Sequence, residues 1–247
     1  MNRFSGKSVI VTGSSSGIGR ATAVLFAKYG AQVTITGRDA GKLEATKKKM
    51  LKVMKNPENV CVVVANLTDS DGQDEIVQSA LDAFGRIDVL VNNAGANVVD
   101  GTFNTDQSTE LYHKTFQINF EAVIEMVKKT KNHLIESKGE IVNVSSVAAG
   151  PQALAPSPYY AASKAALDQY TRCVALDLIL QGIEENFTSN RACIPAGVCG
   201  KPEDIAELII FLADRKRSSY IIGQSIVADG GTSLVSGLTA QNIQRNN

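Results

Sequence analysis

A tyrosine and a lysine lie four residues apart in the segment Tyr160-Ala161-Ala162-Ser163-Lys164. The sequence from Tyr160 through Leu180 predicts a helix, and residues four apart on a helix share a face. An ammonium close to a phenol favours the phenolate, so it lowers the pKa of a tyrosine from its ordinary value of about 10. The pair could therefore exchange a proton with a substrate oxygen. Tyr159 precedes the pair, but only Tyr160 has a lysine at this spacing.

Two more polar residues lie where a helix and a strand could bring them to the same site. Residues 139–146 predict a buried strand that ends in Ser145 and Ser146, upstream of Tyr160. Asn119 lies among apolar neighbours within a long helix that the pattern predicts from Thr105 to Ser137. Because a buried polar side chain is costly unless it is hydrogen-bonded, Asn119 either supports this helix or binds a water.

The first turn of the chain has the composition of a phosphate-binding site. The apolar run Val9–Val11 predicts a strand, which breaks into a turn with three glycines and continues as a helix through Ala21–Ala27. Glycines let the backbone bend sharply and approach a pyrophosphate, and the amide groups at the start of the helix favour an anion. An ordinary glycine and serine turn is the alternative. The residues expected to bind are Gly13, Ser15, Ser16, Gly17, Ile18 and Gly19.

The end of the second predicted strand, Gln32–Arg38, indicates which nucleotide is bound. A chain that prefers NAD usually carries a carboxylate here to hold the ribose 2′-hydroxyl, whereas this chain has Gly37 followed by Arg38. A guanidinium can bind a 2′-phosphate through two hydrogen bonds. The sequence thus favours NADP(H), with an Arg38 that only solvates the strand end as the alternative.

The order of strands and helices predicts the fold. Apolar strands alternate with helices along the first half of the chain, which predicts right-handed crossovers and an open parallel sheet. Asn92-Asn93-Ala94-Gly95-Ala96 follows the fourth strand, at the sheet edge where such folds bind ligands. We therefore expect a single α/β domain over residues 1–247, a three-layer, doubly wound Rossmann fold.

Composition excludes several classes of partner. The 247 residues contain 25 Lys and Arg and 25 Asp and Glu, so the chain is formally neutral and favours neither nucleic acid nor an anionic membrane. No run of about 18 apolar residues predicts a membrane span, and the first strand begins too early for a secretory signal, so we expect a cytoplasmic protein. The four cysteines are scattered without metal-ligand spacing, so no metal site is expected.

Five motifs, taken in their order along the chain, resemble those of the classical short-chain dehydrogenase/reductase superfamily. The resemblance is strongest to its glucose-dehydrogenase-like and tropinone-reductase-like members. The motifs are Thr12-Gly13 with Gly17 and Gly19, Asn92-Asn93-Ala94-Gly95, Asn119, Ser146, and Tyr160 with Lys164.

The resemblance implies hydride transfer between NADP(H) and a small alcohol or carbonyl compound. It implies that Tyr160 is the general acid or base, that Ser146 holds the substrate oxygen, and that Lys164 also binds the nicotinamide ribose. Asn119 would carry a water in a proton relay. Adenine contacts would fall on Asn66 and Leu67, further cofactor contacts on Asn93, Ala94 and Gly95, and the chain would form a homo-oligomer.

The sequence departs from the family pattern after Gly182. Residues 184–195 contain neither the apolar run expected of a sixth strand nor the Pro-Gly that precedes the mobile substrate-covering segment. We therefore expect the sixth strand and this segment to be missing, through a splice variant, a faulty gene model or a real loss. Two functions follow: an NADP(H)-dependent oxidoreductase, or a catalytically impaired NADP(H)-binding or oligomerising protein.

Overall fold

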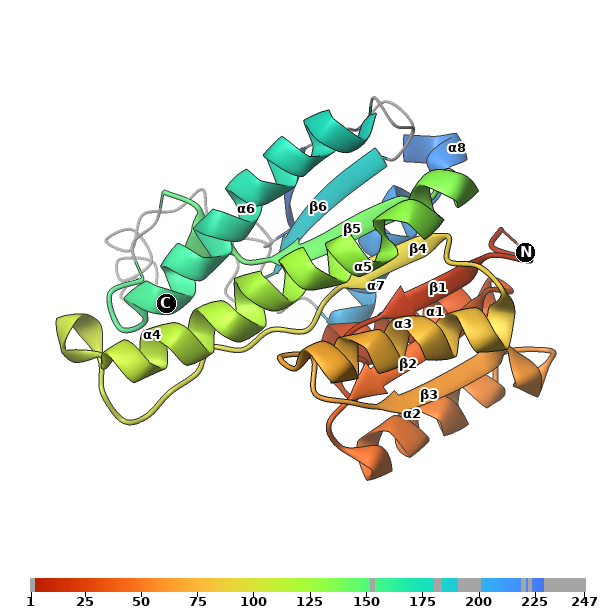
Figure 1. The fold of residues 1–247 in the computed structure, drawn as a ribbon, viewed down its shortest axis with the longest axis horizontal. Helices are drawn as coiled ribbons and strands as arrows, with labels where there is room; N and C mark the ends of the chain where they lie inside the picture. Colours follow the sequence, from red (N-terminus) through yellow and green to blue (C-terminus); the bar gives the residue numbers. More distant parts are fainter. Residues whose placement is uncertain are drawn as a thin grey trace, which may run out of the picture.

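A seven-stranded sheet forms the centre of the computed structural model, which describes residues 3–151, 154–179, 184–190, 201–218, 221 and 224–228 (Figure 1). The strand order is β3-β2-β1-β4-β5-β6-β7, and each of the six pairings is parallel. The strands are β1 (Ser8–Val11), β2 (Gln32–Gly37), β3 (Val60–Val64), β4 (Val89–Asn92), β5 (Glu140–Ser145), β6 (Glu184–Asn190) and β7 (Ser225–Ala228).

Helices cover both faces of the sheet and bury one apolar core on each side. On one face α1 (Gly17–Lys28), α2 (Ala40–Leu51) and α7 (Pro202–Leu212) pack on the strands through residues such as Phe26, Leu43 and Ile209. On the other face lie α3 (Ser70–Phe84), α5 (Ala122–Ser137) and α6 (Pro158–Ile179), with Ile76, Met126 and Leu167 fully buried. This arrangement confirms the expected three-layer, doubly wound fold.

The remaining elements are short and lie between the main ones. They are α4 (Thr109–Phe116), α8 (Arg215–Ser218) and the single turns η1 (Pro57–Asn59), η2 (Asn104–Asp106) and η4 (Val147–Ala149).

The long helix expected from Thr105 to Ser137 is interrupted at Asn119. It begins only at Thr109, and the five residues of η3 (Gln117–Glu121) form a π-helical segment between α4 and α5. Such a segment adds a residue to the turn, so some backbone groups are left out of the regular hydrogen-bond pattern of the α-helix. π-Helical segments are frequent at functional sites. The fully buried Asn119 lies at its centre.

The expectation of a missing sixth strand was wrong. Residues Glu184–Asn190 form β6, which pairs with β5 along six residues and with β7 along four. Both neighbouring strands present a row of backbone N–H and C=O groups, and an unpaired row inside a sheet is costly. Backbone pairing therefore outweighs the polar composition of the segment. The expected loss of the Pro-Gly and the covering segment concerns residues 191–200, outside the described part of the chain.

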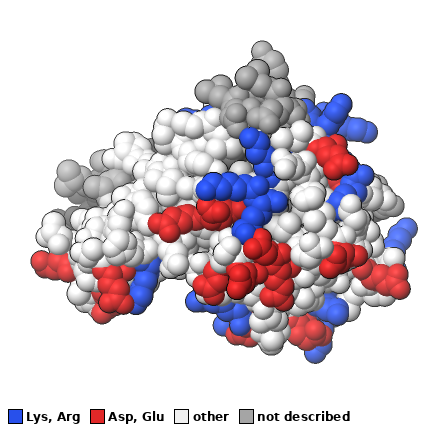
Figure 2. Space-filling model, viewed as in Figure 1, with Lys and Arg blue, Asp and Glu red and all other residues white. Residues whose placement is uncertain are grey.

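Acidic and basic side chains are interspersed on the face in view, in keeping with the neutral composition (Figure 2). Within the described ranges, no helix is long and apolar enough to cross a bilayer, and no cluster of His, Cys, Asp and Glu could hold a metal ion.

Candidate functional site

A cavity of about 800 Å³ opens at the carboxyl ends of β1 to β5. Open parallel sheets bind their ligands at this edge, where the strand order reverses between β1 and β4. Its wall combines most of the residues singled out in the sequence: Gly13, Ser15, Ser16, Gly17, Ile18, Arg38, Asn66, Leu67, Asn93, Ala94, Gly95, Tyr160 and Lys164. The wall does not include Gly19, Asn119 or Ser146.

The glycine turn has the geometry that a phosphate cradle needs. Gly13 and Gly17 have φ angles of +63° and +53°, in the left-handed region that favours glycine. A Cβ on Gly13 would also lie 2.8 Å from the Cα of Ala94, and one on Gly19 would overlap the Gly13 carbonyl. Ser16, at the start of α1, makes no side-chain cap hydrogen bond, so the first amide groups of the helix remain directed at the cavity.

Thr12 fixes this turn to the segment that follows β4. Its hydroxyl oxygen accepts hydrogen bonds from the amides of Asn93 and Ala94, both at 3.0 Å. The Asn93 side chain donates in turn to the carbonyls of Thr12 and Gly13, at 2.9 and 3.2 Å. Two segments about eighty residues apart therefore form one rigid wall of the cavity.

Arg38 and Asp39 are adjacent at the end of β2, but their side chains have different partners. Arg38 is exposed and lines the cavity. Asp39 caps α2, where its carboxylate accepts from the Lys42 amide at 3.0 Å and pairs with the Lys42 ammonium at 3.3 Å. These bonds from Lys42 keep the pKa of Asp39 below its ordinary value. The carboxylate is thus engaged outside the cavity wall, and the guanidinium is the charge presented at this end.

Asn66 lies in the cavity wall, but its side chain is already paired. Its amide nitrogen donates to Asp69 at 2.9 Å, and its carbonyl oxygen accepts from the amide and hydroxyl of Thr68 at 3.3 and 3.0 Å. These bonds shape the turn between β3 and α3. The expected contact of this amide with adenine would have to compete with them, whereas Leu67 offers an apolar surface beside it.

Lys164 is buried beneath the floor of the cavity. It is 3% exposed, and its Nζ donates to the Val144 carbonyl at 3.0 Å. Burial lowers the pKa of Lys164 to about 8, while the negative charge of Asp168 acts in the opposite direction. Tyr160, one helical turn earlier on α6, contributes to the same cavity wall.

Asn119 connects the π-helical segment to both neighbouring parts of the site. Its side-chain oxygen accepts from the Ala96 amide at 2.8 Å, and its nitrogen donates to the Ala96 carbonyl at 2.9 Å and to Ser163 at 3.1 Å. Ser163 lies on α6 between Tyr160 and Lys164. Asn119 therefore supports the loop after β4 and the helix that carries the tyrosine.

The two serines at the end of β5, Ser145 and Ser146, have different hydrogen-bond partners. Ser146 is buried, and its hydroxyl oxygen accepts from the Ala148 amide at 3.2 Å, which leaves its proton available to another acceptor. Ser145 points to the other side of the strand, contributes to the cavity wall, and donates to Asp168 at 2.6 Å. Sequence reasoning assigned no role to Ser145, although the alternation of side chains along a strand separates it from Ser146.

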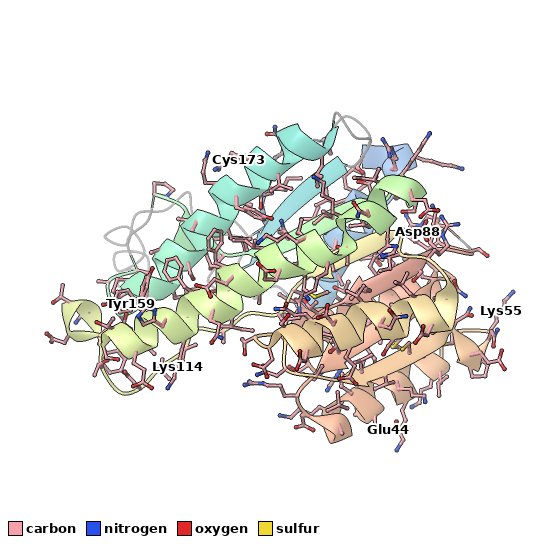
Figure 3. All side chains as sticks on the ribbon, viewed as in Figure 1. Glu44, Lys55, Asp88, Lys114, Tyr159 and Cys173 are labelled. Carbon is pink, nitrogen blue, oxygen red and sulfur yellow. The ribbon has the colours of Figure 1, made fainter. Side chains whose placement is uncertain are left out.

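A pair of hydrogen bonds joins the loop after β4 to the start of α6. Asn97 donates to Ser157 at 3.0 Å, and the Tyr159 hydroxyl donates to the Gln107 carbonyl at 3.1 Å. Figure 3 shows Tyr159 beside α4, at the end of the molecule that carries Lys114 and far from Asp88. Tyr159 therefore has a structural partner of its own, which agrees with the choice of Tyr160 for the chemistry.

Two cavity residues on α4 and η3 were not expected. Lys114 and Gln117 line the cavity together with Ile118. Lys114 pairs with Glu110 at 2.5 Å, and Gln117 donates weakly to the Thr68 carbonyl at 3.5 Å. Their spacing of three and four residues places them on one helix face, which is the signal that could have identified them.

The short chain dehydrogenase family model matches residues 7–190, which include β6. A solved short-chain dehydrogenase/reductase of unknown function from Caenorhabditis elegans, with cofactor, is 54% identical and has a TM-score of 0.95, covering 96% of this chain and 99% of that one. A solved glucose dehydrogenase of the same organism in the apo form is 51% identical, with a TM-score of 0.89 and coverage of 94% and 100%. These similarities agree with the resemblance to glucose-dehydrogenase-like members.

A curated relative, the 3-oxoacyl-[acyl-carrier-protein] reductase FabG of Thermotoga maritima, is 34% identical, and the match covers 93% of this chain and 98% of that protein. The alignment extends over 249 positions, more than the length of this whole chain. The relative therefore has positions with no counterpart here.

Proposed function

Because this chain belongs to the short chain dehydrogenase family, we propose that it is an NADP(H)-dependent oxidoreductase that interconverts a secondary alcohol and a carbonyl compound. The observation that carries the proposal is that Tyr160 and Lys164 contribute to the same cavity wall as the glycine turn. A small-molecule substrate and a homo-oligomeric assembly are part of the proposal.

The residues of the glycine turn fit a dinucleotide. Positive φ angles at Gly13 and Gly17, and the open amide groups at the start of α1, suit a diphosphate that must approach the backbone closely. NADP(H), when bound, supplies or accepts the hydride at its nicotinamide ring. Gly13, Ser15, Ser16, Gly17 and Ile18 would hold the diphosphate. Gly19 would keep the cradle closed by letting α1 pack against it.

Two side chains would contact the substrate oxygen, and two others would support them. Tyr160 gives a proton to the carbonyl oxygen during reduction and takes it back during oxidation. The Lys164 ammonium stabilises the phenolate that forms in between, because an opposite charge nearby favours the charged form. Ser146 donates its free hydroxyl proton to the same substrate oxygen, and Asn119 holds α6 in place through Ser163.

Cofactor preference follows from the charges at the end of β2. A 2′-phosphate would meet the exposed guanidinium of Arg38 and no carboxylate from Asp39, which is engaged by Lys42. This arrangement supports NADP(H) over NAD(H). Lys114 adds a second positive charge to the cavity wall, although Glu110 neutralises most of it.

The test compares Tyr160→Phe with the matched control Tyr159→Phe. We expect Tyr160→Phe to lower kcat by at least about a thousandfold in a screen of carbonyl substrates, since it removes the transferred proton. NADPH affinity, followed by fluorescence titration, should stay within about twofold. Tyr159→Phe loses one hydrogen bond to Gln107 and should keep most of its activity. Equal turnover by Tyr160→Phe and the wild type would refute the assignment.

The short link between β6 and α7 favours a second candidate function. Only residues 191–201 join β6 to α7, while the relative from Thermotoga has positions without a counterpart here. A lid that excludes water and completes the site is a common requirement of such enzymes. If the wild type binds NADPH but reduces no carbonyl compound, the chain is a catalytically impaired NADP(H)-binding protein.

A further inference from the structure

Asp168 lies one helical turn beyond Lys164 on α6, at a position that the proposed chemistry does not use. Its carboxylate is half-buried and accepts a short hydrogen bond of 2.6 Å from the Ser145 hydroxyl. The same Ser145 oxygen lies 3.3 Å from the Lys164 carbonyl. Ser145 thus connects the end of β5 to the turn of α6 that contains both charged residues.

The Lys164 ammonium needs a counter-charge. It is withdrawn from water, and its identified hydrogen-bond partner is a neutral carbonyl, that of Val144. Removing an ammonium from water costs several kcal/mol unless an opposite charge offsets it. Desolvation lowers the pKa of Lys164 to about 8, and Asp168 is the group whose attraction raises it.

The other groups around the pair do not provide that charge. The Lys164 ammonium donates to the Val144 carbonyl of β5 and lies beside Gly95, as does the neutral amide of Asn119 from η3. Ser145 of β5 contacts the Lys164 carbonyl, and Tyr160 on the same helix shares the cavity wall. Facing Asp168 are Ser145 and, on α6, Lys164 and the exposed Arg172. Burial raises the pKa of Asp168, and the Ser145 hydrogen bond, Arg172 and Lys164 counter that rise.

We propose that Asp168, fixed by Ser145, is a positioning residue that keeps the buried Lys164 ammonium charged beneath the cofactor cavity. The carboxylate acts across one helical turn in a poorly hydrated region, where charges attract more strongly than in water. The consequence for turnover rests on the proposed function, because only there does the charge of Lys164 stabilise a phenolate. The effect on Lys164 itself does not depend on any cofactor or substrate.

The test measures the pKa of Lys164 directly in the cofactor-free protein. Protein labelled with [13Cε]lysine is titrated by NMR, and the Lys164 resonance is identified by its absence in Lys164→Met. We expect Asp168→Asn to weaken proton binding by Lys164 about tenfold, a shift of about one pKa unit downwards. Ser145→Ala should shift it in the same direction by less, and Asp168→Glu should restore most of the wild-type value.

The control variant is Glu125→Gln, which removes an exposed carboxylate on α5 that pairs with Lys128. It should leave the Lys164 titration unchanged. Circular dichroism checks that each variant is folded, and Ser145→Ala serves in place of Asp168→Asn if the latter does not fold. A Lys164 titration that is the same in these variants as in the wild type would overturn the proposal.

Turnover gives a second readout. In the pH profile of kcat with NADPH, the basic limb should move to lower pH in Asp168→Asn, while NADPH affinity at about pH 6 stays within about twofold, because Lys164 remains mostly protonated there. A uniform loss at every pH would indicate a merely structural role and count against the proposal. If the wild type shows no turnover, the proposed function fails while the NMR titration still decides the role of Asp168.

Discussion

The side chains of Asn119 and Lys164 converge on Gly95. A Cβ at this glycine would lie 2.9 Å from the Asn119 Oδ1 and 3.1 Å from the Lys164 Nζ. The amide comes from the π-helical segment and the ammonium from α6, so the absence of a side chain at Gly95 lets two distant elements meet behind the cavity wall.

Gly95→Ala should disturb this meeting point. The added methyl must displace Asn119 or Lys164, both of which are fixed by hydrogen bonds. We expect kcat/KM to fall by about a hundredfold, since small misplacements of reacting groups carry costs of that order. Steady-state kinetics with NADPH measure it. Gly41→Ala is the control, because its Cβ would make only an ordinary contact of 3.5 Å with Asp39, and its activity should be unchanged.

Arg38→Leu should change cofactor preference. The variant loses the guanidinium that would bind the 2′-phosphate, so we expect the ratio of kcat/KM for NADPH over NADH to fall by at least about tenfold. Lys48→Gln removes an exposed positive charge on α2 outside the cavity wall and controls for net charge. An unchanged ratio in Arg38→Leu would count against the role of Arg38.

Lys164→Met should stabilise the cofactor-free protein at neutral pH. The folded-state pKa of about 8 lies below the ordinary value of 10.5, so the charged lysine destabilises the fold below pH 8. That cost is of the order of 3 kcal/mol. The variant also loses the hydrogen bond to Val144, so its net gain in stability is about 2 kcal/mol. The gain declines as the pH rises from about 8 towards 10.5.

Urea denaturation of Lys164→Met at pH 7 and 9.5 checks this sign. The gain in unfolding free energy over the wild type should be larger at pH 7. Lys128→Met, an exposed position, should change it by less than about 0.5 kcal/mol at both values. A variant less stable than the wild type at pH 7 would contradict the assigned cost of the buried charge.

Asp88→Asn should destabilise the amino-terminal edge of the sheet, far from the site (Figure 3). Asp88 is 1% exposed and accepts from Lys7 at 2.8 Å, the Ser8 amide at 3.0 Å, and Arg86 at 2.7 and 2.6 Å. Burial would raise the pKa of Asp88, but the bonds from Arg86, Lys7 and Ser8 outweigh it and lower the pKa. We expect a loss of about 2 kcal/mol at pH 7.

The pH dependence of that loss has a defined direction. Because the folded-state pKa of Asp88 is depressed, its contribution is present above the unfolded value of about 4 and disappears as the pH falls through the folded value. The difference between wild type and Asp88→Asn should therefore shrink below pH 4. Glu110→Gln, which breaks the exposed pair with Lys114, should cost less than about 0.5 kcal/mol at pH 7.

Several features of the site could be read only in part from the sequence. The family resemblance implied an adenine contact for Asn66, and in the structure the Asn66 amide is paired with Asp69 and Thr68. It also left out Ser145, whose role depends on Asp168 of another element. In both cases the partner of a polar side chain decides its role, and partners from other elements are not visible in a linear pattern.

The sequence by itself determined the strand, the glycine turn and the helix that follows it, and the shared face of Tyr160 and Lys164, because glycine conformation and helix periodicity act over a few residues. Tertiary structure alone decided that Glu184–Asn190 is a strand, since β5 and β7 on either side offer backbone groups that need partners. It also decided the pKa of Lys164, because the burial that lowers this pKa exists only once α6 is packed on the sheet.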